Sequence, residues 1–411
     1  MEWAYSSSYL LRPMKNRNPL EEIIKGKIEA EGPITFRDYM DLCLYHPEHG
    51  FYTSGRIKIK DGDGGMADFV TNPIQYSPAF GVALASIIAQ LAESNGGGVR
   101  RIISLGPGTG ILDKDLLDGL QAFAPDVYKK VEYTIVEISP ALIKKQKEKL
   151  VRHTSKIDYR CESVIDFRFH TLRNTVVFSN ELFDMFPVHI IKKTARGLKE
   201  SYVKVENGQF VYSLGKCSSD GVKDYVGLGQ AIKRIYVTGE KIVAQVDAIQ
   251  FMRNVSAALE SGVVISFDYG TFYEKQGRAM VRTFSSDPHR MHDGPLKDPG
   301  EKDITSDVDF GIIAAASTEL KVVHVGGDLL SLHEGCRAED IERYKTSEHL
   351  RNALYTAAIK DKRKPYLMLI QQKGDFIIPS DLHDRLRRAQ ECYQRGIKFG
   401  DRLAVHAHLP R

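Results

Sequence analysis

The chain has 411 residues, of which 42% are hydrophobic and 27% charged; this balance is typical of a folded globular protein and excludes a fibrous or disordered one. Its 57 basic and 53 acidic residues give a net charge of +4, and both signs are spread along the chain, so we expect no nucleic-acid partner. No apolar run reaches the roughly 18 residues that a membrane-spanning helix needs, so we expect no membrane span.

The first quarter of the chain is predicted to be mainly helical. Apolar residues recur at helical spacing over 19–30, and a second helix is expected over 35–47, capped by Thr35. The glycine-rich stretch 55–65 is predicted to be a mobile loop. A third helix is expected over 77–93, with a proline in its first turn.

From residue 101 onward, short apolar runs alternate with amphipathic segments. Strands are expected at 101–106 and 131–138, each followed by a helix, at 112–123 and 140–151. This alternation indicates βαβ units and a parallel sheet. Further strands are predicted to end near Asn180 and Gly270, and a last one covers 365–374.

The region between these strands is predicted to contain an antiparallel insertion and a long loop. Residues 188–245 alternate in polarity around an Asn207-Gly208 turn, which is typical of a β-hairpin. The stretch 278–310 is rich in Pro, Asp, His and Gly and is predicted to be a functional loop. We therefore expect five parts. They are a helical N-terminal cap and substrate-side region (1–97), a first core part (98–187), the insertion (188–255), a second core part (256–375) and a C-terminal extension (376–411).

A glycine-rich turn directly follows the first of the parallel strands. Gly106, Gly108 and Gly110 alternate with other residues, so the backbone can fold sharply and approach a ligand closely. The spacing GxGxG differs from the GxGxxG of dinucleotide sites, and Pro107 removes a donor that a pyrophosphate would use. The turn therefore favours a cofactor without phosphate, such as S-adenosyl-L-methionine, bound by these four residues.

Acidic residues follow the next two strands. Glu137 lies where a carboxylate would bridge two ribose hydroxyls, although it could instead cap the helix that begins near Pro140. Glu162 and Ser163 follow the third strand, where an adenine contact is expected, but Glu162 could equally be a loop residue without a role.

A polar cluster ends the buried strand VVF. Asn180, Glu181 and Asp184 would point into the crevice where ligands bind in open α/β sheets. A carboxylate there could hold a cationic guanidinium by paired hydrogen bonds and accept its proton. The alternative is that Asn180 and Asp184 cap the following turn.

Several segments, taken in order, resemble the signature blocks of the MidA family of protein-arginine methyltransferases, which includes bacterial proteins and a mitochondrial assembly factor of respiratory complex I. They are GPITFRDYMDLCLYHPEHGFY at 32–52, DFVTNPIQYSPAFG at 68–81, SLGPGTG at 104–110, NELFDMFPV at 180–188, DYG at 268–270 and DPGEKDITSDVDF at 298–310. The resemblance implies a Rossmann-like class I methyltransferase fold, a seven-stranded and mostly parallel sheet with a helical N-terminal cap and inserted hairpin and loop regions. It also implies S-adenosyl-L-methionine as cofactor and methylation of an arginine in a protein partner, in the mitochondrial case a subunit of complex I. By the same resemblance Asn180, Glu181 and Asp184 face the reacting centre.

The chain departs from the family pattern at three positions. Ser104 and Thr109 replace the acidic residue and the arginine of the family's ELGPGRG, and Asp307 replaces a histidine. A missing carboxylate weakens the expected link to the cofactor's ammonium group. Two alternatives to the enzyme therefore stay open: an assembly factor with little or no catalysis on the same fold, and a nicotinamide-dependent oxidoreductase, which only the glycine turn suggests.

The remaining expectations concern metals and compartment. The loop 282–309 collects His289, His292 and several carboxylates, but none stands at zinc-ligand spacing, so no metal is expected. The five widely spaced cysteines favour a reducing compartment. We expect the cytoplasm if the source is a prokaryote and the mitochondrial matrix if it is a eukaryote; a weak presequence pattern lies in the first 17 residues.

Overall fold

A computed structural model describes residues 18–57, 70–96, 98–272, 280–287, 293–344 and 366–394, together with Arg290 and Asn352. Most of the glycine-rich stretch 55–65, the possible presequence, and both His289 and His292 lie outside these residues. The predictions made for them are therefore not addressed.

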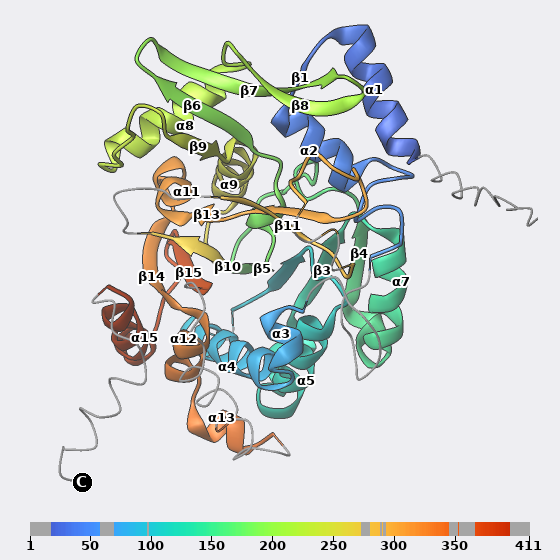
Figure 1. Cartoon of the computed structure of the whole chain (residues 1–411). Helices are drawn as coiled ribbons and strands as arrows, with labels where there is room; N and C mark the ends of the chain where they lie inside the picture. The colour runs from blue at the N-terminus through green and yellow to red at the C-terminus, as the bar shows by residue number, and fades with distance from the viewer. Residues whose placement is uncertain are drawn as a thin grey trace, which may run out of the picture.

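The centre of the molecule is a mixed sheet in the order β14-β15-β10-β5-β2-β3-β4, with the short β13 paired to β10 (Figure 1). The pairs from β10 to β4 are parallel, whereas β15 runs antiparallel to both of its neighbours. The path has seven strands, which confirms the predicted sheet. Their bounds are β2 Arg101–Leu105, β3 Glu132–Glu137, β4 Ile157–Cys161, β5 Thr175–Asn180, β10 Gly262–Thr271, β13 Val308–Asp309, β14 Lys321–Gly327 and β15 Tyr366–Lys373.

Both faces of this sheet are buried. In β5, Val176 packs into one hydrophobic cluster and Val177 into another, and Val263 and Val264 of β10 divide in the same way. This alternation explains why the strands appear in the sequence as continuous apolar runs. Helices cover the first face at α4 Ala79–Ser94, α5 Ile111–Phe123, α12 Asp328–Gly335, α13 Ala338–Glu342 and α15 Ser380–Gln394, and the second at α8 Asp220–Ala231, α9 Val246–Ala258 and α11 Phe310–Ala316.

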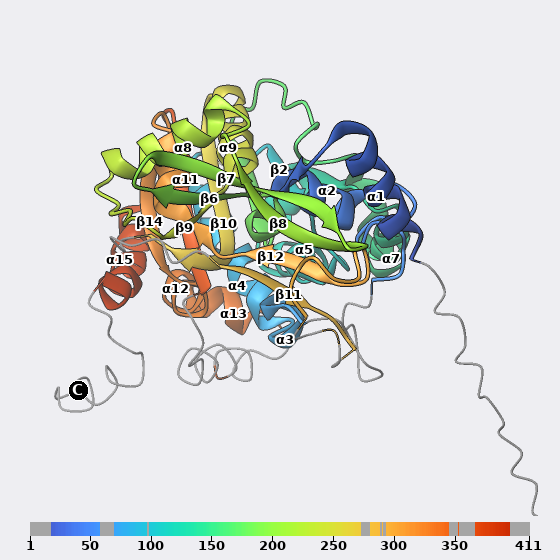
Figure 2. The ribbon, with the colours of Figure 1, turned by 45° about the horizontal axis from the view of Figure 1, so that its top comes forward.

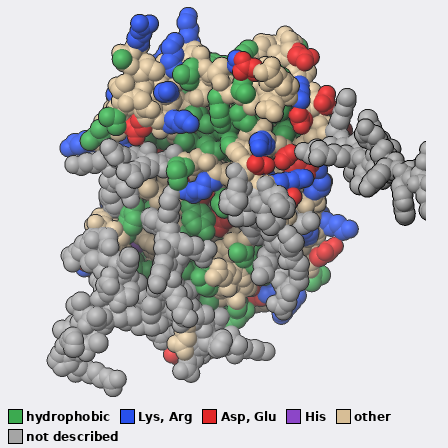
Figure 3. All heavy atoms as spheres, in the orientation of Figure 1, with side chains coloured by type: hydrophobic (Ala, Val, Ile, Leu, Met, Phe, Trp, Pro, Cys, Tyr) green, Lys and Arg blue, Asp and Glu red, His purple; other side chains and the backbone are tan. Residues whose placement is uncertain are grey.

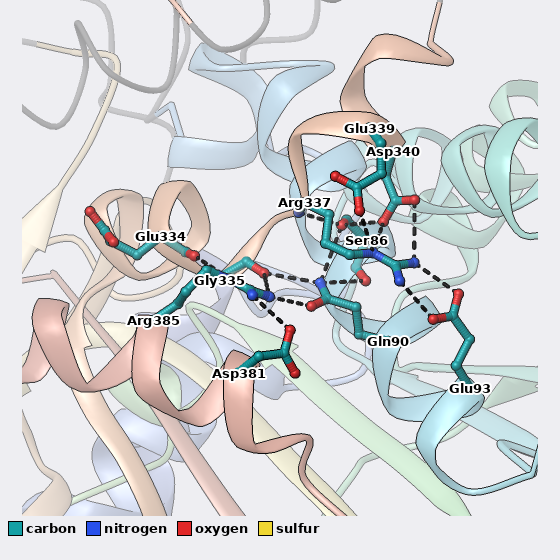
Figure 4. Close-up of polar contacts among 10 residues, drawn as sticks. All are labelled: Ser86, Gln90, Glu93, Glu334, Gly335, Arg337, Glu339, Asp340, Asp381 and Arg385. Atoms are coloured by element: carbon teal, nitrogen blue, oxygen red, sulfur yellow. Dashed lines mark hydrogen bonds and ion pairs between the residues drawn. The ribbon is translucent and has the colours of Figure 1, made fainter. Parts of the chain in front are cut away.

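A set of polar groups, of which Ser86, Gln90 and Asp340 are buried, joins α4 to the C-terminal helices (Figure 4). Ser86 donates to Asp340 at 2.7 Å, and Arg337 binds the same carboxylate as well as Glu93. Arg385 of α15 reaches Gln90 from the other side. The contact of Arg385, together with the burial of Leu382 and Leu386, attaches α15 to the core, although the sequence suggested only an extension beyond residue 376.

A second, antiparallel sheet lies at the top of Figure 1. Its order is β1-β7-β6-β9, with β8 on the far side of β7. The turn from β7 to β8 places Asn207 and Gly208 at positive φ, as a tight hairpin requires, so the predicted hairpin insertion is confirmed. The bounds are β1 Ile34–Thr35, β6 His189–Thr194, β7 Gly197–Glu206, β8 Gln209–Gly215 and β9 Lys241–Ala244.

The first two helices pack on this second sheet and not on the central one. Asn18 caps α1 (Pro19–Glu31), and Thr35 caps α2 (Phe36–Tyr45), as predicted for Thr35. Phe36 and Tyr39 of α2 are fully buried in a third hydrophobic cluster together with Val203 of β7. The N-terminal cap thus joins the insertion to form one layer above the central sheet.

A hairpin of β11 (Val281–Phe284) and β12 (Asp303–Ser306) lies between this layer and the central sheet (Figure 2). It contacts α2 on one side and the short helix η2 (Phe183–Met185) that follows β5 on the other. The predicted long loop at 278–310 therefore contains two paired strands in its described part.

The other predicted helices are found with small changes at their ends. The expected third helix over 77–93 is α4, with Pro78 as its N-cap, and the short α3 (Asn72–Gln75) before it was not predicted. The helix predicted over 140–151 is α7 (Pro140–Lys149), followed by the 3-10 turn η1 (Val151–Lys156), and α6 (Pro125–Lys130) was not predicted. Because α4 belongs to the core, the described part of residues 1–97 does not form one packing unit.

Candidate active site

A cavity of about 650 Å³ opens at the carboxyl ends of β2, β3 and β5. This is where the strand order reverses between β2 and β5, the position at which open α/β sheets bind ligands. Its walls come from the central sheet, from α2 and from the hairpin β11–β12. The lining residues used below are Tyr45, Tyr52, Ser104, Gly106, Pro107, Gly108, Thr109, Asp113, Glu137, Ser163, Asn180, Glu181, Asp184, Arg282, Asp303 and Asp307.

The glycine turn forms one wall. Gly106, Gly108 and Gly110 all have positive φ, from 58° to 78°, a conformation that favours glycine. Gly106, Pro107 and Gly108 line the cavity. Gly110 does not; it is the N-cap of α5, and a Cβ there would lie 3.1 Å from Gln146. Its observed contribution is the close packing of α5 against α7.

Glu137 ends β3 and is 4% exposed. Its Oε1 accepts from the Ser139 amide at 2.9 Å, and its Oε2 accepts from Gln146 at 3.3 Å. Burial raises the pKa of Glu137 to about 7. The cap of α7 is Ser139, whose hydroxyl accepts from the Leu142 amide, so the alternative role of Glu137 as a helix cap is not what the structure shows.

Of the two residues predicted to contact the adenine after the third strand, only one lines the cavity. Ser163 lines the cavity, together with the neighbouring Val164 and Ile165, whereas Glu162 is partly buried and is not among the lining residues. The apolar side chains next to Ser163 suit a flat aromatic base.

The polar cluster after β5 faces the cavity. Asn180 and Glu181 both accept a hydrogen bond from the Tyr366 hydroxyl, at 2.6 Å and 3.1 Å. Glu181 has a φ of +50°, a backbone conformation that is costly for a residue with a side chain. Burial, and then the charge of Asp268, raise the pKa of Glu181 to about 8.

Asp184 lies one turn further along and is 8% exposed. Its Oδ1 has no hydrogen-bond partner among the described residues, and burial with the nearby carboxylates raises its pKa well above the ordinary value. Asp268 of β10 accepts from the amides of Phe183 and Asp184, at 2.9 and 3.2 Å, and so fixes this turn. Neither Asn180 nor Asp184 caps a helix there, since η2 has no side-chain cap.

The N-terminal layer and the hairpin complete the walls. Of the residues concerned, the motif analysis singled out only Asp307, as a departure from the family pattern. The Tyr45 hydroxyl donates to the Met185 carbonyl at 3.0 Å, and the Tyr45 and Tyr52 rings stack. Arg282 of β11 forms a two-pronged ion pair with Asp307, at 2.6 and 2.7 Å. Tyr45 and Tyr52 lie within the block 32–52 and Asp268 within DYG, so the resemblance carried the only signal for them.

The cavity is strongly acidic at its base. Burial raises the pKa of Glu181, Asp184 and Asp268, and neighbouring carboxylates add to the rise for Glu181 and Asp184. A bound cation would favour their charged forms. Buried oxygens of Thr109 and Gln146 beside the glycine turn also have no partner among the described residues. The lining therefore fits a ligand that carries positive charge, hydroxyls and a flat base.

Residues 81–327, more than half of the chain, match the model of a family described as S-adenosyl-L-methionine-dependent methyltransferases. The chain belongs to this family. The methyltransferase is 26% identical over 325 residues to "Protein arginine methyltransferase NDUFAF7 homolog, mitochondrial" of Caenorhabditis elegans, covering 75% of this chain and 74% of that protein. It is 26% identical over 333 residues to the mouse protein arginine methyltransferase NDUFAF7, with 75% and 72% covered.

A crystal structure of a protein from Burkholderia thailandensis bound to S-adenosyl-homocysteine is also similar to this methyltransferase. The TM-score is 0.70 at 26% identity, covering 88% of this chain and 94% of that one. The fold class and the cofactor predicted from the sequence are thereby confirmed, and the nicotinamide alternative is excluded. The methyl group comes from the cofactor, so the protein supplies orientation, charge and exclusion of water.

The structure adds two observations on partners. Within the described ranges, no helix is both long enough and apolar enough to cross a membrane, and no group of three His, Cys, Asp or Glu side chains is placed to hold a metal. In the described part of the face in Figure 3, Lys and Arg side chains gather at the upper left, whereas Asp and Glu side chains lie mainly toward the right, mixed with further basic ones. The absence of a nucleic-acid partner stays a prediction.

Proposed function

We propose that this methyltransferase methylates an arginine side chain of a protein partner. The observation that carries the proposal is the pair of carboxylates at the end of β5, Glu181 and Asp184, which lie in the same cavity as the glycine turn. A carboxylate can hold a guanidinium by paired hydrogen bonds. The relatives named as protein arginine methyltransferases support the same substrate class.

The charge balance supports a cationic methyl acceptor. The cofactor has a positive sulfonium, so a guanidinium brought to it is repelled unless negative charge lies nearby. Glu181, Asp184 and Asp268 supply that charge in a site shielded from water, where electrostatic interactions are strong. With its pKa raised to about 8, Glu181 is also suited to take up the proton that the nitrogen loses.

In this proposal the cofactor donates its methyl group to a guanidinium nitrogen, and S-adenosyl-homocysteine and a proton are released. Glu137 holds the ribose, and the apolar surface beside Ser163 holds the adenine. Glu181 and Asp184 orient the guanidinium, with Tyr366 and Asp268 fixing their positions. The resemblance further implies a subunit of respiratory complex I as substrate, and a mitochondrial location if the source is a eukaryote.

The test is transfer of labelled methyl groups to protein extracts from cells that lack this chain, followed by hydrolysis and identification of the labelled amino acid. We expect labelled methylarginine with the wild-type chain and almost none with Glu181→Gln. Label on lysine or on a small molecule would contradict the proposal. Saturable cofactor binding without transfer to any protein would favour the assembly factor.

A further inference from the structure

Asp113 is a fully buried carboxylate that borders the cavity. It lies in the first turn of α5, directly after the glycine turn, and is 0% exposed. The Tyr133 hydroxyl donates to its Oδ1 at 2.8 Å. Its Oδ2 has no partner at hydrogen-bonding geometry within the described residues. A buried carboxylate beside a ligand cavity is thus incompletely paired.

A second carboxylate on the same helix shows that burial does not by itself cause this. Asp115 is 1% exposed, but the Ser77 hydroxyl donates to one of its oxygens and Lys114 to the other. It does not line the cavity. The helix therefore carries one carboxylate, Asp115, whose two oxygens both have partners in the protein, and one, Asp113, with an oxygen that a ligand could bind.

The unpaired oxygen of Asp113 has an energetic cost. A buried acceptor without a partner destabilises the folded state, and more so when it is charged. Burial raises the pKa of Asp113 to about 6, while the nearby hydroxyls of Ser104 and Tyr133 favour its charged form. A cation bound close to Asp113 would offset the cost by completing its interactions.

Ser104 connects Asp113 to the cofactor site. It is the last residue but one of β2, just before the glycine turn; it lines the cavity and is 1% exposed. It is the position at which the resemblance led us to expect an acidic residue. The chain thus lacks a carboxylate at position 104 of the strand. It has one instead in the first turn of the next helix, where Asp113 lies close to the Ser104 hydroxyl.

We propose that Asp113, together with the Ser104 hydroxyl, binds the ammonium group of S-adenosyl-L-methionine, so that α5 supplies the carboxylate that β2 lacks at position 104. The inference concerns the cofactor and does not depend on which acceptor is methylated. It removes the main argument for weak cofactor binding in this chain.

The test compares ligands with and without the ammonium group by isothermal titration. S-adenosyl-L-methionine and S-adenosyl-homocysteine have this group, whereas 5′-methylthioadenosine has the nucleoside and the sulfur but no amino-acid part. We expect Asp113→Asn to weaken both amino-acid ligands by about 10- to 100-fold and to leave 5′-methylthioadenosine within about two-fold. Asp115→Asn is the matched control and should change none of the three affinities.

Two outcomes would overturn the inference. One is an unchanged affinity of Asp113→Asn for S-adenosyl-homocysteine; the other is an equal loss for 5′-methylthioadenosine, which would mean a structural role. Folding of each variant is checked by circular dichroism. If Asp113→Asn does not fold, the double variant Ser104→Asp with Asp113→Asn is used, because it keeps one carboxylate at the site. It should bind S-adenosyl-homocysteine nearly as tightly as the wild type. Weak binding by the folded double variant counts against the inference.

Discussion

The two halves of the cavity are built in different ways. The loop half, residues 104–113 with Glu137, comes from two consecutive βα units, and its parts lie within about one helix length of each other in sequence. The strand-end half consists of Asn180, Glu181 and Asp184 with Asp268 and Tyr366, which come from three strands, and it is closed by Tyr45 and Arg282. One half is local in sequence, and the other is assembled by the fold.

This difference suggests a division of labour. The loop half has backbone turns and single carboxylates suited to a small ligand of constant shape. The strand-end half has several carboxylates of raised pKa, fixed by Tyr366 and by backbone amides. We therefore expect changes in the loop half to act on cofactor affinity and changes in the strand-end half to act on turnover.

The largest effect is expected for Glu181→Gln. This change keeps the size of the side chain but removes the negative charge, so kcat for arginine methylation should fall about 100- to 1000-fold. The affinity for S-adenosyl-homocysteine, measured by titration, should stay within about two-fold. A comparable loss of cofactor affinity would show that the two halves do not act separately.

Glu137→Gln should act on the other half. Losing the charged acceptor for the ribose hydroxyls is expected to weaken S-adenosyl-homocysteine binding about 10- to 100-fold. Glu162→Gln is the matched comparison, because Glu162 follows the next strand but does not line the cavity, and it should change the affinity by less than about three-fold. Equal losses in both variants would place Glu162 in the cofactor site as well.

Gly106→Ala tests whether the shape of the turn matters. Gly106 has a φ of +59°, and an added Cβ would lie 3.1 Å from Leu182. Gly96 has a φ of +66° but open space around it. Both alanine variants should lose about 1 kcal/mol of stability, measured by urea unfolding, but only Gly106→Ala should also weaken cofactor binding several-fold. Equal cofactor affinity of the two variants would mean that the conformation at Gly106 contributes to stability and not to cofactor binding.

The smallest effect concerns pH. The pKa of Glu181 is raised to about 8, above the value near 4.3 in an unfolded chain, so the folded state holds this proton more tightly. The contribution of Glu181 to the free energy of unfolding is therefore fully present at low pH and is lost as the pH rises through about 5 to 8. Glu181→Gln should make the decline in the free energy of unfolding smaller by at least about 1 kcal/mol, whereas Glu29→Gln, on the exposed side of α1, should leave it unchanged. An identical decline in all three proteins would contradict the raised pKa.

The strands and helices of the central sheet could be predicted because their signals are local. Alternating apolar runs and helical periodicity depend on neighbouring residues, and the glycine turn has to follow a strand and precede a helix. The strand β14 and the helices α12, α13 and α15 were not predicted. Their interiors combine apolar positions with buried polar groups such as Asp340, which Ser86 of the distant α4 helps to satisfy.

By itself, the sequence determined the order of the βα units, the turn at 106–110, the carboxylate at Glu137 and the polar cluster after β5. These follow from local periodicity and from the rule that parallel strands end at one edge of a sheet. Only the tertiary structure decided that Asp113 borders the cavity while Asp115 does not, that Tyr366 and Asp268 fix the acidic turn, and that α2 and the β11–β12 hairpin close it. The physical reason is that burial and pairing of a charged side chain depend on contacts between segments up to hundreds of residues apart, and no local pattern records these contacts.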